Sequence, residues 1–270
     1  MGIFFDTNNA ARCCLCGSSE NLTGEHKIKA SALRAEFGNE RMVIGRFEEP
    51  NNRVKSAQSV KSKALQFAAR MCANCNNSLT QAPDREFDRF HAAAKAMLAK
   101  GKDPKLVFEC EEYEIGSTAY LDVFRYFSKL LCCQLAELGA PRPIHMSSVA
   151  IGGNHTNCVW LDINQDWVYQ KSSSEFGSHQ YAAHGGLVVY GDKKSDAPNA
   201  FHSTLSVGSL RYVFFSRLNW FERTELRLNH CEFYDWCRAK VEEAKHDPLS
   251  EENLLKLGLA PTESPNGDVS

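Results

Sequence analysis

The stretches Cys13-Cys14-Leu15-Cys16 and Cys72-Ala73-Asn74-Cys75-Asn76-Asn77 each contain a C-x2-C pair. Two such turns can direct four thiolates at one tetrahedral site with zinc–sulfur distances of about 2.3 Å, which is typical of a structural zinc ion. The 55 residues between the pairs exceed the usual spacing, so unrelated buried cysteines are the alternative. Cys14 could replace Cys16 or lie behind it. We expect a structural Zn²⁺ held by Cys13, Cys16, Cys72 and Cys75.

A Glu-His pair lies between the two cysteine pairs, in Leu22-Thr23-Gly24-Glu25-His26. A knuckle that joins the cysteine pairs also brings Asn76 close to Glu25 and His26. Carboxylate and amide oxygens are ligands suited to Mg²⁺ or Mn²⁺, and a histidine beside such an ion can accept a proton from an attacking water. An ordinary surface pair is the alternative interpretation of Glu25-His26.

The order of these motifs resembles the HNH endonucleases, also called ββα-metal nucleases, over about residues 10–100. The resemblance implies that Glu25 and Asn76 bind the catalytic Mg²⁺ or Mn²⁺, with Asn77 as the alternative ligand, and that His26 is the general base. It also implies that Glu25 and His26 lie on a β-hairpin, that Asn76 lies at the start of a helix, and that cleavage leaves a 3′-hydroxyl and a 5′-phosphate.

The chain departs from the usual HNH pattern at several positions. Glu25 stands where Asp is more frequent, and no proline follows His26 at the position where many members have one. The long span before Cys72 implies an inserted hairpin at about residues 42–60, and Asn51 or Asn52 is the candidate for the middle asparagine. Pro83 predicts either a kink after Asn76 or a short turn followed by a new helix capped by Asp84.

The charge is divided unevenly along the chain. Residues 1–105 contain 17 Lys and Arg against 11 Asp and Glu, a net charge of +6, whereas the remainder has 14 against 22, a net charge of −8. A basic front half is compatible with phosphate contacts. We predict such contacts for Lys27, Lys29, Lys61, Lys63 and Arg70, although each could instead belong to a solvated surface.

The hydrophobic pattern predicts a mixed α/β rear domain. Together with the N-terminal ββα-metal module that the resemblance implies, this gives an expected α+β fold. The expected domains are residues 1–104 and 105–259, followed by a loose tail at 260–270. Helices are expected at 84–100 and 120–138. Strands are expected at 105–110, 146–151, 157–163, 167–170, 186–191 and 203–207. The apolar stretch 211–221 could be a buried strand or a buried helix.

Composition limits the classes of protein that fit. The 43% hydrophobic and 24% charged residues are typical of a globular protein. No apolar stretch is long enough to predict a membrane span, and the start lacks the pattern of a secretory signal. The eleven cysteines are an odd number, which favours reduced thiols. We therefore expect a cytoplasmic protein.

The expected function is metal-dependent hydrolysis of nucleic acid, most readily double-stranded DNA. The alternatives are an RNA nuclease and a non-catalytic zinc-knuckle protein that binds nucleic acid or acts as an adaptor, which would need no general base. The rear domain matches no motif, so a small-molecule or protein regulator and a homodimer are further expectations. Such an arrangement is common in bacterial defence and mobile-element nucleases that resemble this chain.

Overall fold

The structure is a computed structural model that describes residues 2–7, 10–38, 42–46, 54–57, 62–166, 181–191 and 195–245. Lys61, Asn51 and Asn52, together with the strand expected at 167–170 and the tail at 260–270, lie outside the described residues. The described part mixes helices and strands, which agrees with the predicted α+β class. No helix in that part is long and apolar enough to cross a membrane.

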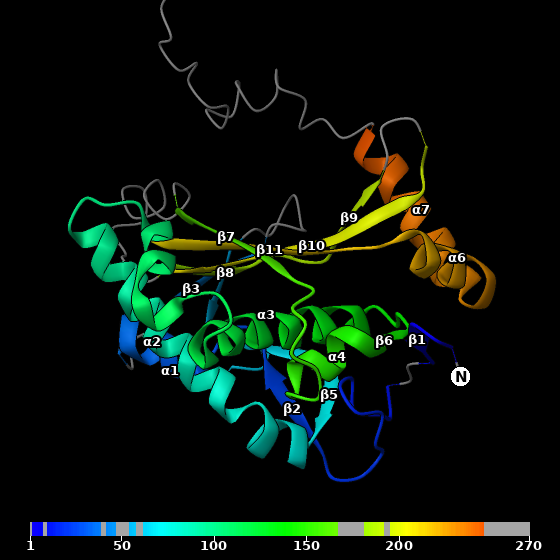
Figure 1. Ribbon diagram of the computed structural model, residues 1–270, viewed down its shortest axis with the longest axis horizontal. Helices are drawn as coiled ribbons and strands as arrows, with labels where there is room; N and C mark the ends of the chain where they lie inside the picture. The colour runs from blue at the N-terminus through cyan, green and yellow to red at the C-terminus, as the bar shows by residue number, and fades with distance from the viewer. Residues whose placement is uncertain are drawn as a thin grey trace, which may run out of the picture.

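A seven-stranded sheet forms one layer of the molecule (Figure 1). Its strands follow the order β4-β3-β8-β10-β11-β7, and β9 also pairs with β10. The β3–β8 pair is parallel, and the other pairs are antiparallel. The strands are β3 Met42–Arg46, β4 Val54–Ala57, β7 Trp160–Gln165, β8 Tyr181–His184, β9 Val188–Gly191, β10 Pro198–Val207 and β11 Leu210–Arg217.

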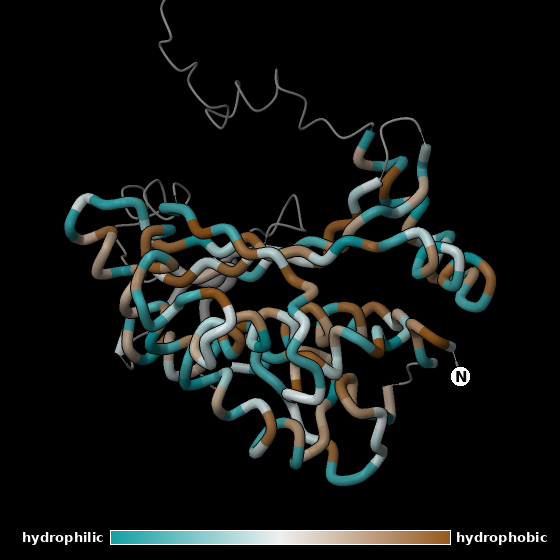
Figure 2. Tube along the Cα trace, viewed as in Figure 1, coloured by the Kyte–Doolittle hydropathy of each residue, from teal (hydrophilic) through white to brown (hydrophobic). Residues whose placement is uncertain are grey.

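Helix α3, Thr118–Glu137, lies directly beneath this sheet (Figure 1), and its buried residues belong to both hydrophobic clusters of the core. Figure 2 shows hydrophobic residues along α3 and along the strands that cover it. Thirteen of its twenty residues are buried, which is typical of a helix packed on nearly every side. The helix packs against α2, Gln81–Ala99, and also contacts strands β5, Gln66–Cys72, and β10. The prediction of a buried helix at 120–138 is therefore confirmed.

A second, two-stranded sheet lies on the other side of α3 (Figure 1). Strands β2, Leu22–His26, and β5, Gln66–Cys72, pair in antiparallel fashion. A π-helical turn at Cys75–Leu79 and then α2 follow β5 directly. The expected strand, strand and helix order is therefore present, with Glu25 and His26 on the first strand and Asn76 in the first helical turn.

The segment between β2 and β5 contains helix α1, Ala30–Phe37, and the antiparallel pair β3–β4. This pair confirms the hairpin expected at about residues 42–60. Strand β3 also pairs with β8 of the second half. One cluster of buried residues joins Leu33 and Phe87 to Phe127, Tyr212 and Phe214. The boundary predicted at residues 104 and 105 therefore does not divide the core.

Two predicted strands are wrong because helix-starting residues precede them. Residues 104–109 form the 3-10 helix η3, where the Asp103 side chain accepts a hydrogen bond from the Lys105 amide and Pro104 occupies the first turn. Residues 144–150 form helix α4, directly after Pro143. A short apolar stretch does not distinguish a strand from a buried helix, and proline is favoured at helix starts.

Pro83 and Asp84 lie inside the first turn of α2. The helix begins at Gln81 after Thr80, so the prediction that Asp84 caps it is wrong. Pro83 is tolerated there because the first amides of a helix have no intrahelical acceptor. The expected short turn before a new helix is present as the π-helical turn Cys75–Leu79.

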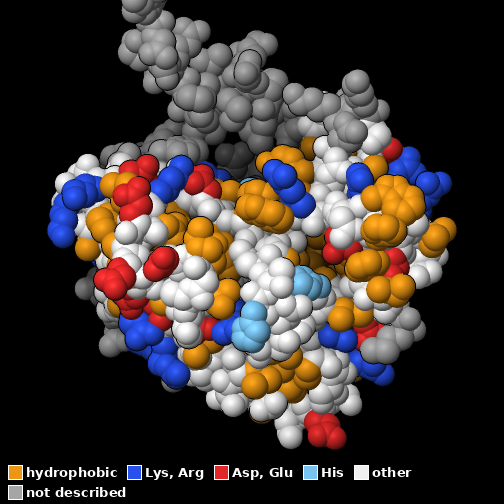
Figure 3. Space-filling view, in the orientation of Figure 1, with side chains coloured by type: hydrophobic (Ala, Val, Ile, Leu, Met, Phe, Trp, Pro, Cys, Tyr) orange, Lys and Arg blue, Asp and Glu red, His pale blue; other side chains and the backbone are white. Residues whose placement is uncertain are grey.

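The stretch 211–221 contains both a strand and the start of a helix. Strand β11 ends at Arg217, and α6, Trp220–Asn229, precedes α7, Cys231–Lys245. Asn219 and Glu222 form a reciprocal capping box at the start of α6, a signal that the sequence contained. Trp220, Phe221 and Leu228 of α6 are exposed, on the side where hydrophobic side chains gather in Figure 3.

Glu225 of α6 holds the N-terminal segment. Its carboxylate accepts hydrogen bonds from the amides of Ile3 at 2.9 Å, Phe4 at 3.1 Å and Phe5 at 2.8 Å. Burial tends to raise the pKa of Glu225, but the three amides favour the ionised form, and the pKa lies below its usual value. The contact connects β1, Phe5–Asp6, to α6.

Replacing Glu225 by Gln is expected to lower the free energy of unfolding by about 1 to 3 kcal/mol at pH 7, because hydrogen bonds to a charged acceptor are lost. A carboxyl with a lowered folded pKa stabilises the protein above its unfolded pKa of about 4.3 and loses that contribution as the pH falls further. Urea unfolding between pH 7 and 3 measures this. The exposed Glu232→Gln variant is the control, and an equal effect of both variants would contradict the prediction.

Candidate metal centre

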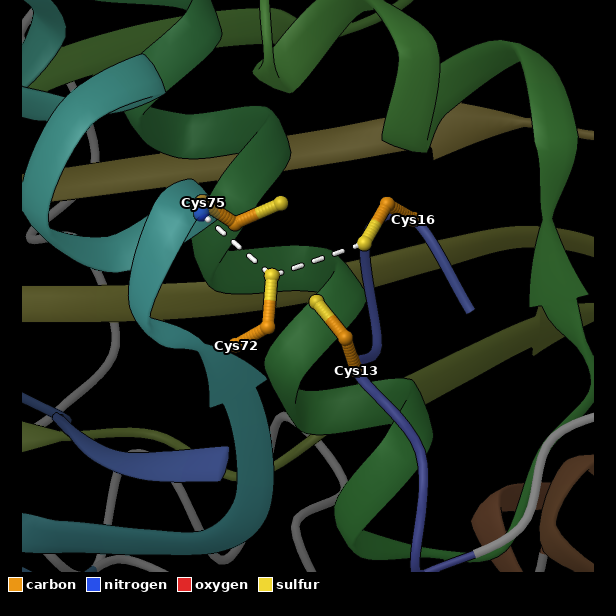
Figure 4. A group of neighbouring side chains, drawn as sticks. All are labelled: Cys13, Cys16, Cys72 and Cys75. Atoms are coloured by element: carbon orange, nitrogen blue, oxygen red, sulfur yellow. Dashed lines mark hydrogen bonds between the residues drawn. The ribbon is translucent and has the colours of Figure 1, made fainter. Parts of the chain in front are cut away.

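The four predicted zinc ligands lie together. The sulfur atoms of Cys13, Cys16, Cys72 and Cys75 are all within 4.8 Å of one another, and the four side chains point at a common centre in Figure 4. Cys16 Sγ is 3.6 Å from Cys72 Sγ. A tetrahedral zinc site with bonds of about 2.3 Å requires sulfur atoms about 3.8 Å apart. The cluster is therefore compatible with a structural metal ion.

Local turns aim these sulfur atoms. The Gly17 amide donates to the Cys13 carbonyl at 2.9 Å, and Gly17 has a φ of 76° that favours glycine. The Cys75 amide donates to Cys72 Sγ at 3.4 Å where β5 passes into the helical turn. Each C-x2-C pair thus curls around its first sulfur, and the β2–β5 pairing brings the two turns together.

The thiols influence one another strongly. A hydrogen bond from the Cys75 thiol, together with hydrogen bonds from backbone amides, outweighs the effect of burial and lowers the pKa of Cys13 to about 4. The same hydrogen bond raises the pKa of Cys75, and burial raises that of Cys16. One thiolate in the cluster therefore opposes ionisation of its neighbours. A bound cation removes this opposition, since metal-bound thiols are deprotonated.

Cys14 does not belong to the quartet. It is buried, and its sulfur lies 3.7 Å from Cys133 Sγ on α3. Burial and the thiol of Cys132 raise the pKa of Cys14, although the Cys133 thiol acts in the opposite direction. Cys14 therefore packs the knuckle onto α3, and Cys16 is the partner of Cys13 in the cluster.

Glu25 and His26 lie at an irregular point in the β2–β5 pair. Gly24 is opposite Arg70 and His26 is opposite Gln66, so three residues of β5 face Glu25 alone. A bulge of this kind re-aims side chains and is frequent beside active sites. Glu25 is buried. Nε2 of His26 is also buried and has no hydrogen-bond partner among the described residues.

Asn76 joins the helical turn to β2. Its side-chain amide donates to the Gly24 carbonyl and to the Thr23 hydroxyl, both at 3.0 Å. Because a carbonyl oxygen can only accept, the amide nitrogen must face β2, which leaves the side-chain oxygen available as a ligand. Asn77 is exposed instead. The structure therefore places the Asn76 side chain, rather than that of Asn77, against Thr23 and Gly24, the two residues that precede Glu25.

Lys129 of α3 lies within this site and was missed by sequence reasoning. Its ammonium is 2.8 Å from Glu25 Oε1 and 2.5 Å from Asp84 Oδ1. Burial disfavours the charged form, but the Glu25 and Asp84 carboxylates outweigh it and raise the pKa of Lys129 above its usual value. The sequence did contain a signal for it. A lysine at the centre of a predicted buried helix indicates an internal ion pair, because buried lysines need charged partners.

The predicted phosphate-binding residues fall into two groups. Lys27 is 2.9 Å from Glu137, and Lys29 bonds to Asp88 at 2.5 Å and to the Asp84 carbonyl. The other group, Lys63 and Arg70, is exposed and has no ion pair with any described residue. The Arg70 guanidinium lies beside Gly24. Exposed Arg85 follows Asp84 and was not among the predictions.

Glu25 and Asn76 are the predicted ligands of the catalytic divalent ion. Glu25 and Asn76 each retain one oxygen without a hydrogen bond to the described residues, and both oxygens are of the type that Mg²⁺ or Mn²⁺ prefers.

Comparisons of the chain with protein-family models, with curated proteins and with solved structures found no match. The function proposed below therefore rests on the residues of the site and their contacts.

Proposed function

We propose that this protein is a metal-dependent HNH endonuclease that hydrolyses phosphodiester bonds of DNA. The observation that carries the proposal is the contact of Asn76 with the backbone of Gly24. It joins the first helical turn to the strand that holds Glu25 and His26, directly beside the cysteine cluster. A protein that only binds nucleic acid needs no histidine beside hard oxygen ligands.

Each group has a distinct role in this proposal. The cysteine quartet binds the structural zinc, which holds the two chain segments together. Glu25 and Asn76 hold a Mg²⁺ or Mn²⁺ ion, which when bound supplies a Lewis acid for a phosphate oxygen. His26 accepts a proton from the attacking water through Nε2. The absence of a competing hydrogen bond to Nε2 from the described residues supports this role.

The exposed cations beside the site are the proposed contacts to the nucleic-acid backbone. Arg70 and Lys63 have no ion pair with described residues, whereas the ammonium groups of Lys27 and Lys29 are already paired with Glu137 and Asp88. A cation that is already paired with a carboxylate has to give up that ion pair to bind a phosphate, whereas an unpaired cation does not. We therefore place the backbone contacts along the β5 side of the site.

Arg70→Ala is expected to weaken binding of nucleic acid similarly for all sequences, and to reduce the slope of log affinity against log salt by about 1. Fluorescence anisotropy with labelled duplex DNA from 50 to 200 mM salt measures both quantities. Lys27→Ala is the matched control because its cation belongs to an internal pair. A larger loss of affinity in Lys27→Ala than in Arg70→Ala would contradict this assignment.

One observation favours a second candidate function, a zinc-knuckle protein that binds nucleic acid without cutting it. The Glu25 carboxylate is already neutralised by the buried ammonium of Lys129. If Lys129 occupied both carboxylate oxygens in solution, no divalent ion would be held. Lys129 bonds Oε1 of Glu25, which leaves Oε2 for a divalent ion. We therefore prefer the endonuclease to the non-catalytic protein.

The class of nucleic acid and the assembly are part of the proposal. Double-stranded DNA is the preferred substrate, and RNA is the alternative because phosphodiester hydrolysis does not itself distinguish the sugar. A homodimer would allow cuts in both strands. A small molecule or protein that binds near the large sheet would fit the proposed regulation, as in defence or mobile-element nucleases located in the cytoplasm.

A substrate panel tests the proposal. Supercoiled plasmid, linear duplex, single-stranded DNA and RNA are incubated with the full chain in Mg²⁺, in Mn²⁺ and in a chelator of divalent ions, and binding is measured in parallel. We expect duplex DNA to be cut only when a divalent ion is present. Binding of all four substrates without cleavage would replace the proposal with the non-catalytic candidate.

A further inference from the structure

Lys129 is a fully buried lysine in the described part of the chain. Its side chain is 1% exposed, yet it carries an ammonium group in the middle of α3. That group bonds one oxygen of Glu25 on β2 and one oxygen of Asp84 on α2. It also lies 5.2 Å from the centre of the Tyr126 ring. Three separate elements therefore meet at one nitrogen atom.

The geometry is that of a cation held between two carboxylates. The distances of 2.8 and 2.5 Å from Lys129 Nζ to the Glu25 and Asp84 oxygens approach those of about 2.3 to 2.6 Å from a bound calcium ion to its oxygen ligands. Without Lys129, the two carboxylates would face each other in a nearly dry environment. Such a pair requires a positive partner, because an unpaired buried charge is costly.

We propose that Lys129 is a positioning residue that takes the place of a divalent ion between Glu25 and Asp84. It fixes the Glu25 carboxylate through Oε1, so that the protein binds no ion between these two side chains. A single divalent ion then remains for the other Glu25 oxygen and Asn76. The catalytic consequence rests on the proposed function, whereas the cation role of Lys129 does not.

The test removes the ammonium and asks whether a metal ion replaces it. Lys129→Ala in the full, zinc-loaded chain is expected to unfold at a lower temperature than the wild type when no divalent ion is added. Added Mn²⁺ at about 100 times its Kd is expected to raise that unfolding temperature by about 5 to 10 °C. Calorimetric titration is expected to detect one more bound Mn²⁺ per chain than in the wild type.

Two further variants separate this role from ordinary packing. Lys129→Ala/Asp84→Asn lacks one of the two carboxylates and is expected to lose both the added Mn²⁺ and the rescue of stability. Lys27→Ala breaks the Lys27–Glu137 ion pair and is expected to gain no Mn²⁺ site. Both variants should therefore respond to Mn²⁺ no more than the wild type does.

Several results would overturn the inference. Equal effects of Mn²⁺ on the wild type and Lys129→Ala would do so, as would an added Mn²⁺ that persists in the double variant. A Lys129→Ala chain that stays unfolded at saturating Mn²⁺ also counts against it, because no ion has then replaced the ammonium. None of these measurements uses nucleic acid, so their outcome is independent of whether the protein cuts it.

Discussion

His26→Ala is expected to lower the rate of phosphodiester cleavage by a factor of about 10² to 10⁴, the usual contribution of a general base. Nε2 of His26 is buried and has no described partner, so removing the ring should break no hydrogen bond from Nε2 to the described part of the fold. Zinc content and unfolding temperature should therefore stay close to the wild-type values. Single-turnover cleavage of plasmid DNA at saturating Mn²⁺ measures the effect.

His145→Ala provides the matched control for this prediction. Both ring nitrogens of His145 already bond, to Thr156 and to Asn154, and it lies on α4 instead of the β2–β5 pair. Its removal is expected to leave the cleavage rate within about twofold of the wild type, since it touches no proposed catalytic group. A His26→Ala protein that cuts at the wild-type rate would remove the general base from the account.

Cys72→Ser is expected to abolish zinc binding and the folded state of the N-terminal region. A structural zinc site of this kind supplies about 10 to 16 kcal/mol in isolated knuckles, which is comparable with the whole free energy of unfolding of a domain, about 5 to 15 kcal/mol. Metal analysis by mass spectrometry and circular dichroism measure the two effects. We expect about one zinc per chain in the wild type and none in the variant.

Cys231→Ser is the control for the zinc prediction. Cys231 is exposed at the start of α7 and lies outside the quartet. This variant should keep its zinc and its fold. If Cys72→Ser retained a full complement of zinc, or if the wild type purified from zinc-containing medium folded without any, the four clustered thiols would not be a structural metal site.

The parts of the site that depend on short spacings could be predicted. Cys13 and Cys16 lie three residues apart, as do Cys72 and Cys75, and a turn of that length directs both sulfurs to one side. Once the pairs meet, chain connectivity alone brings Asn76 close to the strand that holds Glu25. The strand, strand and helix order itself was what the resemblance to the HNH endonucleases implied, and the long insertion does not interrupt it.

The parts that depend on distant partners could not be predicted. Strand β3 pairs with β8 about 140 residues away in the sequence, and hydrophobic periodicity carries no information about which strands become neighbours. For the same reason, the sequence predicted that Lys27 and Lys29 contact phosphate. In the structure they form ion pairs with Glu137 and Asp88. Lys129 required the position of α3 against β2 and α2, which no local pattern contains.

The measurement that tests the central claim most directly is a plasmid cleavage time course with the wild-type protein, after its zinc content has been determined. The account predicts that the zinc-loaded protein converts supercoiled DNA to nicked or linear product in Mg²⁺ or Mn²⁺, and that a chelator of divalent ions stops the reaction while the zinc remains bound. Zinc-loaded, folded protein that binds DNA and RNA but cuts neither, at any concentration of either ion, would contradict the account.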